Sequence, residues 1–212
     1  MVPNNMSQYS RDRSKQKLEY FAYVLDVFED ERVIKRIEFK DKRRIEKKVR
    51  VFGKIAQVIG EQYFMLFEVL LKPEANVSIL DKVYIGPGPK AKVDIIIQKV
   101  TYENLTSIAK TELENAVTKI IKSNEEKWIK FLNTAGPITP KLHILELLPH
   151  IGKKKMWQII REREIKPFES FEDFLKRTGI DPIKAIAGRV MEEIMNDQKY
   201  YLFVVKPSPK PF

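Results

Sequence analysis

Residues 147–155, Leu-Leu-Pro-His-Ile-Gly-Lys-Lys-Lys, carry the clearest chemical signal in the chain. The pattern predicts a tight turn that opens a helix at Gly152. The first N–H groups of a helix have no partner within the helix and carry about half a positive charge, so they attract anions. A glycine lets a phosphate oxygen approach that backbone closely. We therefore predict a phosphate site formed by Gly152, Lys153, Lys154 and Lys155.

No set of side chains elsewhere converges into a catalytic site. The two histidines, His143 and His150, are too few to ligate a metal, and the chain has no cysteine, which excludes disulfides and thiol catalysis. No P-loop or dinucleotide fingerprint occurs. Asp173 follows Ser170 by three residues, which is the spacing of a helix cap. We therefore predict no enzyme activity, with a glycosylase or nuclease activity as the alternative, and no metal or cofactor.

A second cationic segment runs from Lys35 to Lys54. It holds ten Lys and Arg residues and three acids, so its net charge is +7 out of the chain's +10. An excess of this size predicts a polyanionic partner, and nucleic acid fits best; a solvated charged loop is the alternative. The candidate phosphate contacts are Lys40, Lys42, Arg43, Arg44, Lys47, Lys48 and Arg50.

Aromatic rings near this segment are candidates for stacking on unpaired bases. Phe39, inside the basic segment, is the preferred stacking ring. Rings on strands are more often buried, so we expect at most one or two exposed rings among Phe52, Tyr63, Phe64, Phe67 and Tyr84.

Residues 18–103 have the composition and alternation of β-strands. Gly60-Glu61 suits a two-residue type II′ hairpin, because glycine tolerates a positive φ. Five short strands predict a small closed barrel of OB-like or SH3-like form, and in an OB-like barrel the basic segment is a loop beside the nucleic-acid groove. The expected strands are 19–28, 48–59, 62–71, 82–85 and 92–101.

The residues after 103 change to a helical period. They predict one connecting helix within 104–135, and the Gly-Pro-Ile-Thr-Pro sequence at 136–140 begins a C-terminal domain, residues 136–199. Asp181 and Pro182 are expected to open its last helix. The expected helices are 141–147, 153–164, 171–177 and 182–195.

The two ends of the chain complete the predicted organisation. Residues 1–17 are polar and lack apolar periodicity, so we expect a disordered basic arm. Residues 200–212 are expected to form a terminal strand over 200–205 followed by a tail, with a packed extended segment as the alternative. No stretch approaches 18 consecutive apolar residues, so no membrane span is expected.

Residues 142–177 resemble the helix-hairpin-helix family in the Pro-His-Ile-Gly turn, in the apolar face that follows and in the Pro-Phe-Glu-Ser entry to the next helix. The resemblance implies that the turn binds phosphates of DNA or RNA without reading sequence. It also implies that Ile151 anchors the turn in the core. His150 stands where that family usually has a glycine; histidine tolerates a positive φ better than most residues, and its ring could donate to a phosphate. The alternative is that His150 weakens binding.

The chain as a whole, from Leu18 to Val205, is similar to an uncharacterised archaeal family of predicted nucleic-acid-binding proteins. The resemblance implies an α+β fold, in which a small five-stranded OB-like barrel is joined by a helix to a C-terminal helix-hairpin-helix domain. It supports an archaeal source and names no reaction.

Together these observations predict a cytoplasmic, monomeric, non-enzymatic nucleic-acid-binding protein that grips phosphates without reading sequence. RNA is preferred to DNA by analogy with barrel proteins of ribosomal or RNA-processing assemblies. One alternative is an adaptor whose hairpin domain docks a protein, and another is a DNA-binding repair or processing factor.

Overall fold

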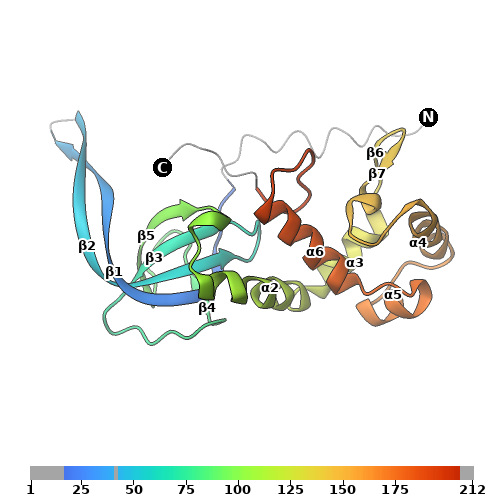
Figure 1. Ribbon diagram of the computed structural model, residues 1–212, viewed down its shortest axis with the longest axis horizontal. Coiled ribbons are helices and arrows are strands. Elements are labelled where there is room, and N and C mark those ends of the chain that lie inside the picture. Colours follow the sequence, from blue (N-terminus) through green and yellow to red (C-terminus); the bar gives the residue numbers. More distant parts are fainter. Residues whose placement is uncertain (1–16, 41–42, 206–212) are drawn as a thin grey trace.

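The computed structural model describes residues 17–40 and 43–205, with side chains described outside residues 35–46. A curled five-stranded antiparallel sheet, open as a half-barrel, is joined to five α-helices, which confirms the α+β class (Figure 1). The strand order is β4-β1-β2-β3-β5, which leaves β4 and β5 at the two edges. The strands are β1 (Phe21–Lys40), β2 (Arg43–Gly60), β3 (Leu66–Leu71), β4 (Lys82–Tyr84) and β5 (Val93–Val100).

The basic segment is paired strand, so its prediction as a loop was wrong. β2 pairs with β3 only from Ile55 to Ile59. Beyond that point β1 and β2 continue to pair with each other, from Glu29↔Lys54 out to Lys40↔Arg43. We call this two-stranded extension, residues 29–40 and 43–54, the β1–β2 arm; it projects from one end of the molecule (Figure 1). The density of charge hid the strand-forming Val and Ile residues in the sequence.

A glycine is needed at position 60 because any larger side chain would overlap Glu19. The prediction of a type II′ turn at Gly60 was wrong. Its φ is not among the positive values, and a Cβ placed on it would lie 2.1 Å from the carboxyl carbon of Glu19. The buried Glu19 carboxylate accepts the N–H groups of Gln62 at 2.8 Å and Tyr63 at 2.7 Å, and so holds the chain after β2. Burial raises the pKa of Glu19, although these backbone donors and the charge of Lys127 oppose the shift.

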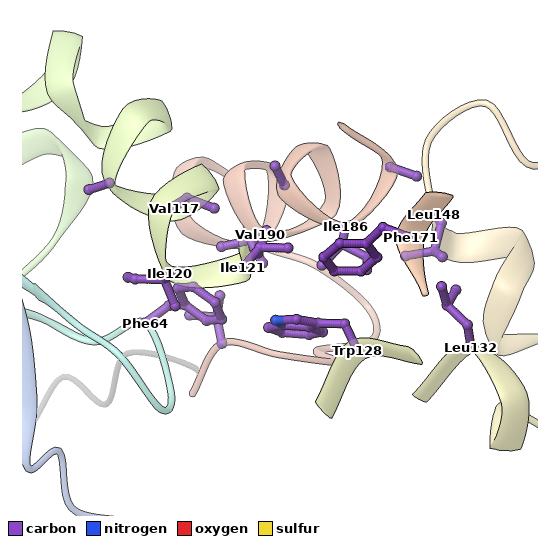
Figure 2. Packing of buried hydrophobic residues seen from close by; sticks show 14 of the residues in the cluster. Phe64, Val117, Ile120, Ile121, Trp128, Leu132, Leu148, Phe171, Ile186 and Val190 are labelled. Carbon is purple, nitrogen blue, oxygen red and sulfur yellow. The ribbon is translucent and has the colours of Figure 1, made fainter. Parts of the chain in front are cut away.

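Both faces of the sheet are packed. Ala56, Val58, Phe67 and Val69 lie in the core inside the curl, while Leu25 and Ile59 belong to a larger core shared with the helices. Figure 2 shows the centre of that larger core, where Trp128 lies beside Phe64 with their ring centroids 6.2 Å apart.

The predicted connecting helix is two helices, α2 (Ser107–Lys122) and α3 (Glu125–Thr134), preceded by a single 3-10 turn, η1 (Tyr102–Asn104). The helix breaks at Asn124, whose φ of −139° and ψ of 45° lie outside the helical region. The apolar period continues across the break, because Trp128 and Leu132 pack into the same core as α2.

A short hairpin and a 3-10 turn replace the helix predicted over 141–147. They are β6 (Pro137–Thr139), β7 (Leu142–His143) and η2 (Ile144–Leu147). The His143 ring accepts the N–H of Leu145, while Glu146 accepts the N–H of His143, so the two side chains cap η2 reciprocally. Desolvation by burial and the nearby charge of Arg163 lower the pKa of His143, which favours this neutral acceptor.

Three further helices confirm the predictions for 153–164, 171–177 and 182–195. They are α4 (Lys153–Ile165), α5 (Phe171–Thr178) and α6 (Pro182–Met195). Ser170 accepts the N–H of Asp173, and Asp181 accepts those of Ile183 and Lys184, as expected of N-caps. No helix in the part of the chain that the structure describes is long and apolar enough to cross a membrane.

Residues 200–205 form no strand, so that prediction was wrong; the segment is packed, but it bends at residues 202–204 instead of running extended. The buried carboxylate of Glu193 accepts the N–H groups of Leu202, Phe203 and Val204 at 2.8 to 3.0 Å. Phe203 then meets Trp128 edge to face, with 5.2 Å between ring centroids. A side chain of α6, and not a neighbouring strand, holds this segment.

Candidate nucleic-acid interface

The turn before α4 contains a positive φ at a residue that is not a glycine. His150 has a φ of 65°, in the left-handed region, and Ile151 is buried in the helical core. Gly152 is the N-cap of α4, and the space that a Cβ would occupy there is open. Neither a positive φ nor close packing therefore requires a glycine at position 152, and the backbone there is exposed to solvent.

The turn before α6 repeats this arrangement. Gly179 has a φ of 68°, matching His150, and Ile180 is buried as Ile151 is. The N-cap in the second turn is Asp181 instead of Gly152. A carboxylate there satisfies the helix N–H groups and repels a phosphate, so of these two turns the one before α4 is suited to an anion.

The α6 helix supports the turn before α4 closely. A Cβ on Gly188 would lie 3.1 Å from the ring of Pro149, so a glycine lets the two elements meet. Beside them is a shallow hollow whose lining includes His150, Arg189, Glu146 and Glu192. Gly152 lines this hollow too, so a phosphate at the turn would lie near these two carboxylates, and the exposed Lys153, Lys154 and Lys155 supply the opposing positive charge.

The β1–β2 arm presents the second set of predicted cations. Lys47, Lys48 and Arg50 are exposed. Side chains alternate along a strand, so Lys48, Arg50, Phe52 and Lys54 share one face of the arm. Arg50 lies 3.5 Å from Glu31, but both side chains are largely exposed and the pair contributes little.

Several predicted residues lie outside the described part of the structure. Lys42 is not described, and the side chains of Lys40, Arg43, Arg44 and Phe39 are not described either. Their backbones place them in strand pairs Lys40↔Arg43 and Phe39↔Arg44 near the end of the arm.

The aromatic rings named in the sequence analysis differ in burial. Phe64 and Phe67 are buried, Tyr63 and Tyr84 are half-buried, and Phe52 is 74% exposed. Trp157 on α4, which is 58% exposed, was not predicted from the sequence; Tyr20 and Phe21 are exposed to a smaller extent. The available signal for Trp157 was its position, four residues after Lys153 and off the apolar face that carries Met156 and Ile159.

A polar row, buried except for Gln98, lies at the base of the arm. Asp26, Gln57, Glu68 and Gln98 stand opposite one another across β1, β2, β3 and β5. Glu68 accepts hydrogen bonds from Gln57 at 3.2 Å and Gln98 at 2.9 Å. It also pairs with Arg32, at the start of the arm, at 3.1 Å. This contact joins the arm to the strand beside it.

The ionised state of Glu68 predicts that the fold around it loses stability at acidic pH. Burial raises the pKa of Glu68, but hydrogen bonds from Arg32, Gln98 and Gln57 and the charge of Arg32 lower it further, so the pKa lies below its usual range. A carboxyl group of this kind stabilises the fold at neutral pH, and the contribution is lost as the pH falls through the folded pKa. Urea unfolding should show the wild type losing stability more steeply than Glu68→Gln from about pH 5 downwards. Parallel curves for the two proteins would contradict this assignment.

The two cationic surfaces lie far apart. The β1–β2 arm is at one end of the longest axis of the molecule, and α4 is at the other (Figure 1). They are therefore two separate surfaces, and substitutions in one are expected to act independently of substitutions in the other.

Comparisons with known proteins place the whole chain in one family. Residues 18–205 match the family model described as "Protein of unknown function (DUF655)", the same range as the predicted resemblance. The "Uncharacterized protein MJ0038" of Methanocaldococcus jannaschii is 40% identical over 199 residues, covering 93% of this chain and 85% of that protein. The crystal structure of Af1531 from Archaeoglobus fulgidus, of the same family, is 41% identical with a TM-score of 0.73, covering 88% of this chain and all of that one. Both relatives are archaeal, and the chain belongs to the DUF655 family.

Proposed function

We propose that this protein is a non-enzymatic nucleic-acid-binding protein that grips phosphates without reading sequence. The observation that carries the proposal is the β1–β2 arm. This projecting strand pair includes the basic segment 35–54, whose net charge is +7, and it has a net charge of +5 in all, with an exposed Phe52 between Arg50 and Lys54. A positive charge of this density on a projecting ribbon suits an extended polyanion.

RNA is the preferred nucleic acid, in a ribosomal or RNA-processing setting. Exposed rings beside cations favour bases that are not paired, and RNA presents such bases in loops, bulges and ends. A two-stranded ribbon also fits the major groove of DNA, so a DNA-binding repair or processing factor is the alternative. Comparing the affinities for RNA and DNA oligonucleotides distinguishes the two.

The finer fold assignments support the same proposal. We interpret the half-barrel as OB-like, because β1, β2 and β3 form a meander and β4 lies beside β1. We interpret the two matched turns, at His150 and Gly179, as a helix-hairpin-helix pair of which the first is suited to phosphate. Contacts at such a turn go to the backbone of the nucleic acid and carry no sequence information.

The direct test is the binding of labelled oligonucleotides of one mixed sequence, as single-stranded RNA, single-stranded DNA and the corresponding duplexes. Fluorescence anisotropy over a range of salt concentrations should show affinity that falls linearly with the logarithm of salt concentration and changes little between sequences. RNA should bind more tightly than DNA. No binding to any of these probes at low salt would refute the proposal.

The contribution of the turn before α4 is tested by Lys153→Glu with Lys154→Glu. An acid in the first turn of a helix stabilises it, so the variant should fold. We expect the slope of affinity against salt to fall by about 1.4 on single strands and 1.8 on duplex DNA, which corresponds to two lost phosphate contacts. A matched control, Lys141→Glu with Lys184→Glu, changes the charge equally at exposed positions outside residues 147–155.

Unchanged affinity in Lys153→Glu with Lys154→Glu would favour the adaptor function for the helical end. The specific observation in its favour is the exposed apolar surface there, where Ile165 is 80% exposed and Leu175 is also exposed. In that case the arm alone binds nucleic acid, and the helices α4 and α5 dock a protein.

A further inference from the structure

The outer face of α4 carries an exposed indole within a cluster of cations. Trp157 lies on this face, and helix geometry places the residues three and four positions away beside it. These neighbours are Lys153, Lys154 and Arg161, all exposed, and Ile160, which is half-buried. No acid occupies any of these four positions.

We propose that Trp157 is a stacking platform for one unpaired base, with the flanking phosphates bound by Lys153 and Lys154 on one side and by Arg161 on the other. The proposal rests on the proposed nucleic-acid binding and adds a class of substrate, an unpaired strand. Lys153 and Arg161 are eight residues apart, so the surface spans about 12 Å along the helix. That length accommodates one base and the phosphates on either side of it.

The charge around the ring selects a nucleic acid over a protein surface. Of the acids that follow on α4, Glu162 pairs with Arg177 at 3.2 Å, whereas the exposed Glu164 lies two turns beyond Trp157, next to Arg161 on the same face. A ring in an apolar protein interface is usually surrounded by other apolar groups, and charged residues are depleted there. Here three cations surround the indole, which matches a polyanion that also offers flat π surfaces.

The same geometry discriminates against a duplex. Within a duplex the faces of the bases are covered by their neighbours, so only an unstacked base can lie against a ring. The arm and the turn before α4 can hold the phosphates of either form. Trp157 is therefore the element that would make the helical end prefer unpaired strands.

Intrinsic fluorescence tests the proposal without a label, because the chain has two tryptophans in opposite environments. Trp128 is buried and Trp157 is exposed. The full-length wild type is titrated with a 12-nucleotide single-stranded RNA and with the blunt duplex of the same sequence, and anisotropy of labelled copies gives the affinity in parallel. We expect the single strand to quench the exposed tryptophan at the concentrations at which it binds, and the duplex to bind without that quenching.

Three variants identify the ring responsible. Trp157→Ala should weaken single-strand binding on the order of 10-fold and leave duplex binding unchanged, as expected for one stacked base. Trp157→Phe should retain most of the affinity and lose the quenching. Ile165→Ala, which removes another exposed apolar side chain of α4, should behave as the wild type.

The outcomes separate the two proposals. If single strands bind by anisotropy while the fluorescence does not change and Trp157→Ala binds as the wild type does, the stacking platform is wrong and nucleic-acid binding stands. If no probe produces an anisotropy change, both proposals are wrong.

Discussion

Neutralising the described cations on one face of the arm, as Lys48→Gln, Arg50→Gln and Lys54→Gln together, should weaken binding to single-stranded RNA by about 100-fold at 0.1 M salt. Three phosphate contacts account for a slope of about 2.1 in affinity against salt, and each is lost when its cation is removed. The slope should therefore fall by the same amount. Anisotropy titrations at several salt concentrations measure both quantities.

Neutral substitutions keep the arm itself intact. Lys54 stands opposite Glu29 in the strand pair, and Arg50 lies beside Glu31. A carboxylate at position 54 or 50 would face another carboxylate, and like charges directly opposite each other destabilise a strand pair. Glutamine avoids this repulsion and retains a long side chain.

A charge-matched control distinguishes the arm from net charge alone. Lys122→Gln, Lys130→Gln and Lys176→Gln remove three exposed lysines from α2, α3 and α5. This variant should bind almost as well as the wild type. Equal losses in the two triple variants would show that the arm has no special part in binding. Combining the arm variant with Lys153→Glu and Lys154→Glu should give the sum of the two free-energy losses, because the surfaces lie at opposite ends of the molecule.

Removing the buried carboxylate of Glu193 should cost about 3 to 5 kcal/mol in the free energy of unfolding, the largest single-residue effect we expect. Glu193→Ala leaves the partner guanidinium of Arg189, 2.8 Å away, inside the protein without its nearest anion. It also removes the acceptor for three backbone N–H groups of residues 202–204. Stable domains have about 5 to 15 kcal/mol in total, so the loss is large.

The adjacent acid provides the control. Glu192 also pairs with Arg189, at 3.3 Å, but its side chain is 45% exposed. Glu192→Ala should therefore cost less than about 1 kcal/mol. Urea unfolding in a Trp157→Phe background lets Trp128, which contacts Phe203, report release of residues 200–205. Similar destabilisation by both substitutions would contradict the role given to Glu193.

The helices α4, α5 and α6 and their caps followed from the sequence, because the forces that define them act within four residues. Ser170 and Asp181 each accept an N–H two or three positions ahead. The turn before α4 followed for the same reason, and so did the separation of a β-rich half from a helical half by hydrophobic period. The concentration of charge in residues 35–54 needed no structure at all.

Several features could not be predicted because they depend on residues far apart in the chain. Pairing from Glu29↔Lys54 to Lys40↔Arg43 turned a predicted loop into an arm. The close approach of Glu19, 41 positions before Gly60, explains a glycine that local rules assign to a turn. Glu193 binds the N–H groups of residues 202–204, which lie nine to eleven positions further along the chain.

The candidate nucleic-acid interface likewise has features that local sequence determines and features that depend on distant contacts. Sequence by itself determined which residues carry positive charge and where a helix begins with free N–H groups, since composition and local hydrogen bonding decide both. Only the tertiary structure decided that Phe52 and Trp157 are exposed while Phe64 and Phe67 are buried, and that the two cationic surfaces lie at opposite ends. Exposure and separation depend on which elements pack against each other, and that packing is set by contacts between residues distant in sequence.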